Sequence, residues 1–184
     1  MEKSMIEQLE HNSVWRLHKW RKYGDERDRI LYMMLRNGAS IEDCLRMGFE
    51  LEAVEEFHGN CLLNEGIQLL EDIIAGLDTT SAKWDSANAN LGVGDGTTAE
   101  SASQTGLQGT NKTYKGMDSG FPSRSNQTLK WRATFGDSEA NHDWQEFTVG
   151  NASSDSGINL NRKVEDKGTK SGGNWTLTLQ ITFS

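Results

Sequence analysis

The chain has 184 residues, which is enough for one sizeable domain or two small ones. Only 35% of the residues are hydrophobic and the formal net charge is −8, so nucleic acid is not expected as the principal partner, because phosphate binding requires clustered Lys and Arg. No signal peptide opens the chain and no apolar run approaches the ~20 residues of a membrane span, so we expect a cytosolically made protein with no membrane partner.

Residues Met1–Tyr23 are predicted to form an amphipathic helix or an exposed arm. Their large apolar side chains follow an imperfect helical stripe: Met5, Ile6, Leu9, Trp15, Leu17 and Trp20. The second half of this stretch is basic and aromatic, a composition that suits docking on an acidic surface or on single-stranded nucleic acid. The alternative is that the tryptophans pack on their own domain while the Lys and Arg side chains stay solvated.

Three short helices are predicted next. Asp25 can cap a helix that runs to Arg36, and Gly38 can end it. Ser40 begins a second helix, with Asp43 in the capping-box position. Residues 50–57 are expected to form the third helix.

The spacing of Cys44, Gly48 and Val54 is typical of a helix-turn-helix, in which these positions hold a small packing residue, a turn glycine and a buried aliphatic residue. The predicted third helix has no Lys or Arg, and it carries Glu50, Glu52, Glu55 and Glu56. Phosphates would repel these carboxylates, so we expect a packing unit or a protein-docking module and not a DNA reader.

A fourth helix is predicted over Glu65–Ala75 as a lid or linker that packs on the C-terminal half. Its expected apolar side consists of Ile67, Leu70, Ile73 and Ile74. The following stretch, to residue 126, is rich in Gly, Ser and Thr, and strands are expected near Ala89–Val93 and Thr113–Met117 because long structureless loops are unusual in compact domains.

Alternating apolar and polar residues then predict four clear strands, at 129–135, 144–149, 158–164 and 174–184. The last of these has five large apolar residues on one face, so we expect it to lie centrally in its sheet. The predicted fold class is α+β: an N-terminal arm and trihelical region over residues 1–58, then an antiparallel β-sandwich over residues 59–184, with a jelly roll as one candidate arrangement.

Candidate chemical sites are few. Asn141-His142-Asp143 could hold a metal or act as a base, but a polar lead-in to a strand is the favoured interpretation. Gly92–Gly96 has the glycines of a phosphate loop without the Lys or the helix that should follow, and it is interpreted as tight turns. Three loop carboxylates, Asp95, Asp137 and Glu139, fit no calcium-binding pattern. Cys44 and Cys61 are predicted to be free, partly buried thiols. We therefore expect no catalysis, no cofactor and no metal.

Several segments of residues 59–184 resemble a family of tailed-bacteriophage virion proteins. The segments that carry this resemblance are 59–67, 88–99, 115–122, 132–136, 160–164 and 168–170. The stretch Trp144–Gly150 keeps the Trp and the Glu of the related pattern but departs from it in the remaining positions. The resemblance is specific for a phage structural protein and not for one role, because similar sandwiches serve as capsid decoration proteins, head fibres and tail-fibre attachment domains.

The resemblance implies a virion structural protein without catalytic residues. Size and the N-terminal arm favour a capsid decoration or cement protein that binds the major capsid protein and neighbouring copies of itself, as a homo-oligomer for which a trimer is attractive. The residues predicted to dock on the capsid are Trp15, Arg16, Trp20 and Arg21. The alternative is a tail, baseplate or fibre component that acts as an adaptor or binds a host receptor through exposed loops such as 150–157. A polysaccharide-degrading enzyme is a distant third, because no cleft with paired carboxylates is evident.

Overall fold

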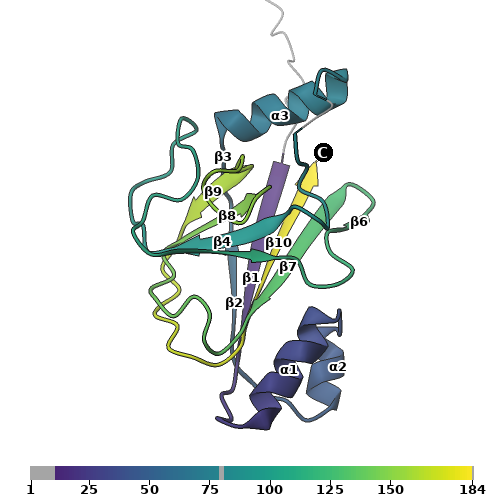
Figure 1. The fold of residues 1–184 in the computed structure, drawn as a ribbon, viewed down its shortest axis with the longest axis vertical. Helices are drawn as coiled ribbons and strands as arrows, with labels where there is room; N and C mark the ends of the chain where they lie inside the picture. The colour runs from purple at the N-terminus through teal and green to yellow at the C-terminus, as the bar shows by residue number, and fades with distance from the viewer. Residues whose placement is uncertain (1–10, 79–80, 184) are drawn as a thin grey trace, which may run out of the picture.

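A computed structural model describes residues 11–78 and 81–183 of the chain. The described part is an α+β fold with two five-stranded sheets of antiparallel strands and three short helices (Figure 1). This confirms the predicted fold class at the level of mostly antiparallel strands in two sheets.

The first sheet has the strand order β2-β1-β10-β7-β6. Its strands are β1 (His11–Trp20), β2 (Leu51–His58), β6 (Ser123–Ser125), β7 (Thr128–Phe135) and β10 (Trp175–Phe183). The C-terminal strand β10 pairs with β1 on one side and with β7 on the other, so its predicted central position is confirmed.

The second sheet has the strand order β3-β9-β8-β4-β5. Its strands are β3 (Cys61–Leu62), β4 (Asn90–Gly94), β5 (Lys112–Gly116), β8 (Glu146–Gly150) and β9 (Asn161–Val164). The predicted antiparallel pairing of the stretch 158–164 with the preceding strand is confirmed by the β8–β9 register. The two very short strands β3 and β6 were not predicted.

One hydrophobic cluster lies between the sheets. The first sheet contributes fully buried side chains such as Trp15, Leu177 and Ala133, and the second contributes Val93 and Phe147. Because successive side chains of a strand point to opposite faces, this packing explains the alternation that the sequence shows in β7 and β10.

The helices lie at opposite ends of the strands (Figure 1). Helices α1 (Glu26–Arg36) and α2 (Ile41–Arg46) pack against the lower end of the first sheet through a second cluster of Trp20, Leu31, Leu35, Cys44 and Phe49. Both predicted N-terminal caps are present, since Asp25 accepts a hydrogen bond from the Arg27 amide and Ser40 forms a capping box with Asp43.

Helix α3 (Asn64–Ala75) crosses the upper end, as the predicted lid (Figure 1). Leu69, Leu70 and Ile73 join the main cluster, but Ile74, which we expected on the apolar side, is 85% exposed. None of the helices in the described ranges is long and apolar enough to cross a membrane.

The expected helix or arm over Met1–Tyr23 is wrong for its second half. Residues His11–Trp20 form β1, a central strand hydrogen-bonded between β2 and β10. The helical stripe was misleading because Trp15 and Leu17 face the core while Arg16 and His18 face the other way, which is a period of two. Residues 1–10 lie outside the described part of the chain.

The predicted third helix, Glu50–Phe57, is also wrong, and the trihelical unit is not formed. Residues Leu51–His58 form the edge strand β2, paired with β1. Glu, Ala and Leu favour a helix only weakly, and pairing with a neighbouring strand overrides that preference. Val54, predicted to be the buried aliphatic residue of a helix-turn-helix, is 52% exposed.

The predicted division at residue 58 falls between β2 and β3. Strands β1 and β2 before it are hydrogen-bonded into the same sheet as β7 and β10 after it. Residues on both sides of this point therefore build one sheet and share one core.

Candidate functional site

The two tryptophans predicted to dock on the capsid are buried. Trp15 is 0% exposed, and its ring stacks on that of Phe57 at a centroid distance of 5.9 Å. Trp20 is 1% exposed and donates its indole N–H to the Thr176 hydroxyl at 3.1 Å. Both rings stabilise the interior in this fold, as in the alternative in which they pack on their own domain, and neither is accessible to a partner.

The two arginines of the predicted docking set do reach the surface. Arg16 forms an ion pair with Glu56, and Arg21 pairs with Glu50 at 2.7 Å. In both pairs the side chains are at least 41% exposed, so each pair contributes little to stability and could exchange its partner. The structure thus separates the four predicted residues into two core residues and two surface residues.

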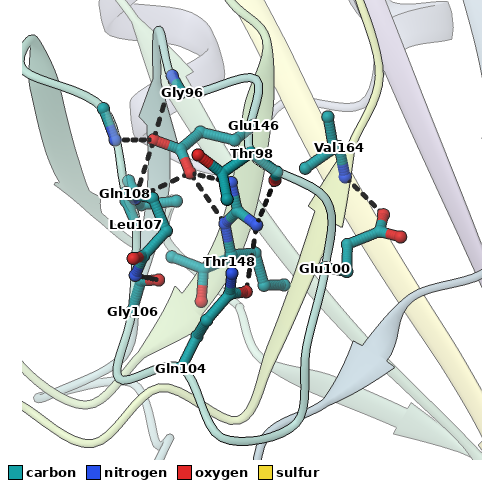
Figure 2. A network of polar contacts seen from close by, with 12 residues as sticks. Gly96, Thr98, Glu100, Gln104, Gly106, Leu107, Gln108, Glu146, Thr148 and Val164 are labelled. Carbon is teal, nitrogen blue, oxygen red and sulfur yellow. Dashed lines mark hydrogen bonds and ion pairs between the residues drawn. The ribbon is translucent and has the colours of Figure 1, made fainter.

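A buried ion pair between Glu146 of β8 and Arg162 of β9 is the most densely bonded polar group of the fold (Figure 2). Both side chains are 0% exposed, and the Arg162 Nε donates to Glu146 Oε2 at 2.8 Å. The Glu146 carboxylate also accepts hydrogen bonds from the amides of Gly96, Gln108 and Gly109, at 3.1, 2.8 and 2.7 Å.

This ion pair holds the long 95–111 loop against the second sheet. From the other side, Arg162 Nη1 donates to the Thr98 carbonyl at 2.8 Å and to Gln104 Oε1 at 3.0 Å (Figure 2). The loop can approach because a glycine stands where a side chain would collide: a Cβ atom at Gly96 would lie 2.5 Å from Glu146 Oε1.

The chemistry of this group is structural. The oxygens of this buried carboxylate are occupied by a guanidinium and three backbone N–H donors, so the group serves to hold its neighbours in place. Neither residue was predicted as a site residue, and the one local signal is that Glu146 alternates with the core residues Phe147 and Val149 in its strand.

A second buried carboxylate, Asp118, attaches α1 to the first sheet. It accepts hydrogen bonds from Arg36 of α1 at 2.9 Å and from Arg132 of β7 at 2.9 Å. It also accepts the Thr134 amide at 3.0 Å. Because Arg132 donates in turn to the Leu35 carbonyl at 2.9 Å, this cluster fixes the C-terminal end of α1 on β7.

The other side chains considered for chemistry lie apart and serve local structure. His142 Nε2 lies 3.2 Å from the Thr113 hydroxyl. Asp95 accepts the amides of Thr110 and Asn111, at 2.7 and 3.0 Å. Hydrogen bonding from the Gly173 amide, with Lys22 nearby, holds the pKa of Asp137 below its usual value. Within residues 11–78 and 81–183, no group of three His, Cys, Asp or Glu side chains is placed to hold a metal ion.

The cysteines are free thiols, as predicted. Cys44 is buried in the cluster under α1 and α2, and burial raises the pKa of its thiol. Cys61 is partly buried in β3, and burial likewise raises its pKa. Both thiols are therefore kept protonated and weakly reactive at neutral pH.

An open cleft of about 550 Å³ lies between α1 and residues 136–139. Its buried Asp28 accepts the Gly24 amide at 2.7 Å, and its Asn174 donates to the Asp28 carbonyl at 2.8 Å. Glu139 accepts the Gly136 amide at 2.7 Å. These hydrogen bonds hold the walls of the cleft together, whereas the buried Asn174 Oδ1 has no hydrogen-bond partner among the described residues.

The end of the molecule formed by α1 and α2 carries an exposed apolar surface that is suited to partner binding. Four large apolar side chains of α1, α2 and the turn after α2 are at least 41% exposed: Ile30, Met33, Leu45 and Met47. We call these four residues the α1–α2 apolar surface. Ile30 and Met33 line a groove of about 650 Å³ together with Met34 and Ala39. Exposed apolar clusters of this kind, with adaptable methionines, are typical of protein–protein contact surfaces.

Comparison with known proteins finds no relative: no family model, no curated protein and no solved structure matches this chain.

Proposed function

We propose that this protein is a structural component of a tailed-bacteriophage virion, and specifically a capsid decoration or cement protein. It binds the major capsid protein lattice, contacts neighbouring copies of itself and catalyses no reaction. The finer fold proposed with it is a β-sandwich of the jelly-roll kind.

Two observations support this proposal. Leu160–Val164 is one of the segments that resemble phage virion proteins, and Trp144–Gly150 keeps the Trp and the Glu of the related pattern; these two stretches contain Arg162 and Glu146, which form the buried ion pair. The observation that carries the docking role is the α1–α2 apolar surface, in which Met47 is 68% exposed. A cement protein must present such a surface to its lattice.

The capsid contact is assigned to the α1–α2 apolar surface, with Arg16 and Arg21 as peripheral contacts. Apolar side chains at the centre of an interface supply most of the binding energy, whereas exposed charges at its rim mainly steer association. Trp20 supports this surface only from inside, and Trp15 lies in the core between the sheets.

The copy number of the protein per purified particle, measured by quantitative mass spectrometry against the major capsid protein, tests the proposal. We expect a ratio near one or near another simple fraction of the lattice. A few to a few dozen copies would assign the protein to the tail, baseplate or a fibre, as an adaptor or receptor-binding component. Absence from the particle would refute a virion role.

The docking surface is tested separately with particles that lack the protein. We expect the double variant Met33→Ser/Met47→Ser to lose at least about tenfold in binding, because both side chains leave water only in the complex. Ile74→Ser, at the opposite end and 85% exposed, is the matched control and should bind as the wild type does.

A further inference from the structure

The free edge of β2 is the longest strand edge that the described residues leave unpaired. Strand β2 has eight residues and lies at the outside of its sheet. The edge strands β3 and β6 have only two and three residues, and β5 carries two lysines that are ion-paired within the fold. An exposed edge of this length is a template for the addition of another strand.

The hydrogen-bond pattern defines which groups of β2 are available. The Gly59 amide donates to the Ser13 carbonyl at 2.9 Å, so the odd-numbered residues of β2 bond with β1. On the other side of β1, the Trp20 amide donates to the Asn174 carbonyl at 3.0 Å, which is the matching alternation toward β10. The main-chain groups of Val54 and Glu56 therefore point away from the sheet. The alternation ends at Glu52, where the register between β1 and β2 shifts, and beyond it the Arg21 amide donates to the Glu50 carbonyl at 2.9 Å.

Glu52, Val54 and Glu56 present their side chains to solvent. Val54 is 52% exposed and stands between Glu52 and Glu56 on one face of the strand. Glu56 forms an ion pair with Arg16, and Glu52 has no ion pair with any residue in the described ranges. Strand β2 contains no Lys, Arg or Pro, so its free edge is acidic, with an apolar side chain at its centre.

The charges of Glu52 and Glu56 indicate which kind of strand can pair with the free edge of β2. If two copies paired antiparallel about Val54, Glu52 of each copy would face Glu56 of the other, and like charges directly opposite each other destabilise a strand pair. A strand with an apolar residue flanked by Lys or Arg at alternate positions has the opposite pattern. It would place a cation beside each glutamate and an apolar side chain beside Val54.

We infer that the free edge of β2 binds an extended, basic segment of another protein as an added strand of the first sheet. The main-chain groups of Val54 and Glu56 supply the hydrogen bonds, and the exposed side chains of Glu52, Val54 and Glu56 select the sequence. This inference does not depend on the proposed virion role, because it concerns the chemistry of the edge and not the identity of the partner.

A symmetric synthetic peptide, acetyl-Thr-Lys-Thr-Val-Thr-Lys-Thr-amide, is the probe. We expect it to bind the full chain in a titration followed by NMR, and to slow the hydrogen exchange of the Val54 and Glu56 amides. The same peptide with Glu in place of both lysines should bind at least about tenfold more weakly. Slower exchange at these amides distinguishes strand addition from attraction between side chains alone.

The protein variant Glu52→Lys tests the selecting charge, and Glu71→Lys on the exposed side of α3 makes the same change in net charge elsewhere. We expect Glu52→Lys to weaken the lysine peptide at least about tenfold and Glu71→Lys to leave its affinity unchanged. Three results would each overturn the inference: no binding at millimolar peptide, equal loss in both variants, or binding without protection of the edge amides.

Discussion

His18 lies on the outer face of the central strand β1, 9% exposed, with Thr176 and Val54 as its neighbours across the sheet. Burial, together with the nearby charges of Arg16 and Arg132, lowers its pKa to about 4. At this position a side chain that is usually a surface group becomes a neutral interior one, because an added proton would have to remain out of water beside two cations.

This burial predicts how stability depends on pH. The unfolded chain takes up the His18 proton below about 6.5 and the folded chain only near 4, so acid favours the unfolded state. The contribution of neutral His18 to the free energy of unfolding is complete above pH 6.5, and the free energy of unfolding declines by about 3 kcal/mol as the pH falls to 4. Urea denaturation of the wild type and of His18→Gln across this range measures it.

The expected difference is a flatter pH profile for His18→Gln. The control is His58→Gln in the edge strand of the same sheet, where the side chain is 62% exposed and the wild-type profile should be retained. If His18→Gln keeps the full wild-type slope, another group is responsible for the loss of stability in acid.

At the scale of elements, the 95–111 loop depends on partners that are distant in sequence. It lies on the outside of the second sheet, and its bonds run to Glu146 and Arg162 (Figure 2). The loop contains few bulky residues, so its own apolar contacts hold it weakly. Its order follows instead from hydrogen bonds to distant partners: the buried ion pair in two adjacent strands, the Asn64 amide, which donates to the Ala102 carbonyl at 2.8 Å, and the Val164 amide, which donates to Glu100 at 2.6 Å.

Removal of the carboxylate is expected to release this loop and to lower the free energy of unfolding strongly. Glu146→Ala leaves the buried Arg162 without its counter-ion and three amides without an acceptor, which corresponds to a loss of about 3–5 kcal/mol. Urea denaturation measures the loss, and faster hydrogen exchange at Gln108 and Gly109 reports the loop.

Glu165→Ala is the control for this experiment. Glu165 is 41% exposed and lies 3.5 Å from the Lys163 ammonium, so its removal should change stability by less than about 1 kcal/mol. Equal losses in the two variants would mean that the buried pair does not anchor the loop.

At the scale of the whole molecule, the two ends of the described chain meet in one sheet. His11 at the start of β1 faces Phe183 at the end of β10, and β10 also pairs with β7. Strand β10 therefore completes both the first sheet and the core beneath it. Contacts between such distant segments make folding slow and dependent on the complete chain.

A chain that ends at Asn174 is expected not to fold. Without β10, the strands β1 and β7 lose their common neighbour and the core loses Leu177, Leu179 and Ile181. Proton NMR should show collapsed amide dispersion, and a synthetic peptide of residues 175–184 should restore it. Native dispersion in the truncated chain without the peptide would contradict this view of β10.

Sequence patterns predicted the positions of helices and strands well where one face of the element meets the core and the other meets water. Strands β7 and β10 alternate along their lengths, and their predicted positions are confirmed. The caps at Asp25 and Ser40 are local hydrogen bonds, so their residues suffice to predict where the first two helices begin.

The same reasoning failed where the neighbours come from far along the chain. Strand β1 lies between β2 and β10, and no pattern within residues 11–20 reveals either neighbour. Strand β2 contains good helix formers, and only its hydrogen bonds to β1 make it a strand. Two of the four candidate docking residues, Trp15 and Trp20, are buried for the same reason, since what lies opposite them decides their exposure.

The sequence by itself thus determined the antiparallel, α+β character of the protein, its acidic charge, its helix caps and the central final strand. These properties follow from side-chain chemistry over a few neighbouring residues. Only the tertiary structure decided that β1 and β2 are strands, that Glu146 and Arg162 meet, and that the edge of β2 is free. Each of these depends on contacts between distant segments, whose free energy exceeds the weak local preferences that a sequence reveals.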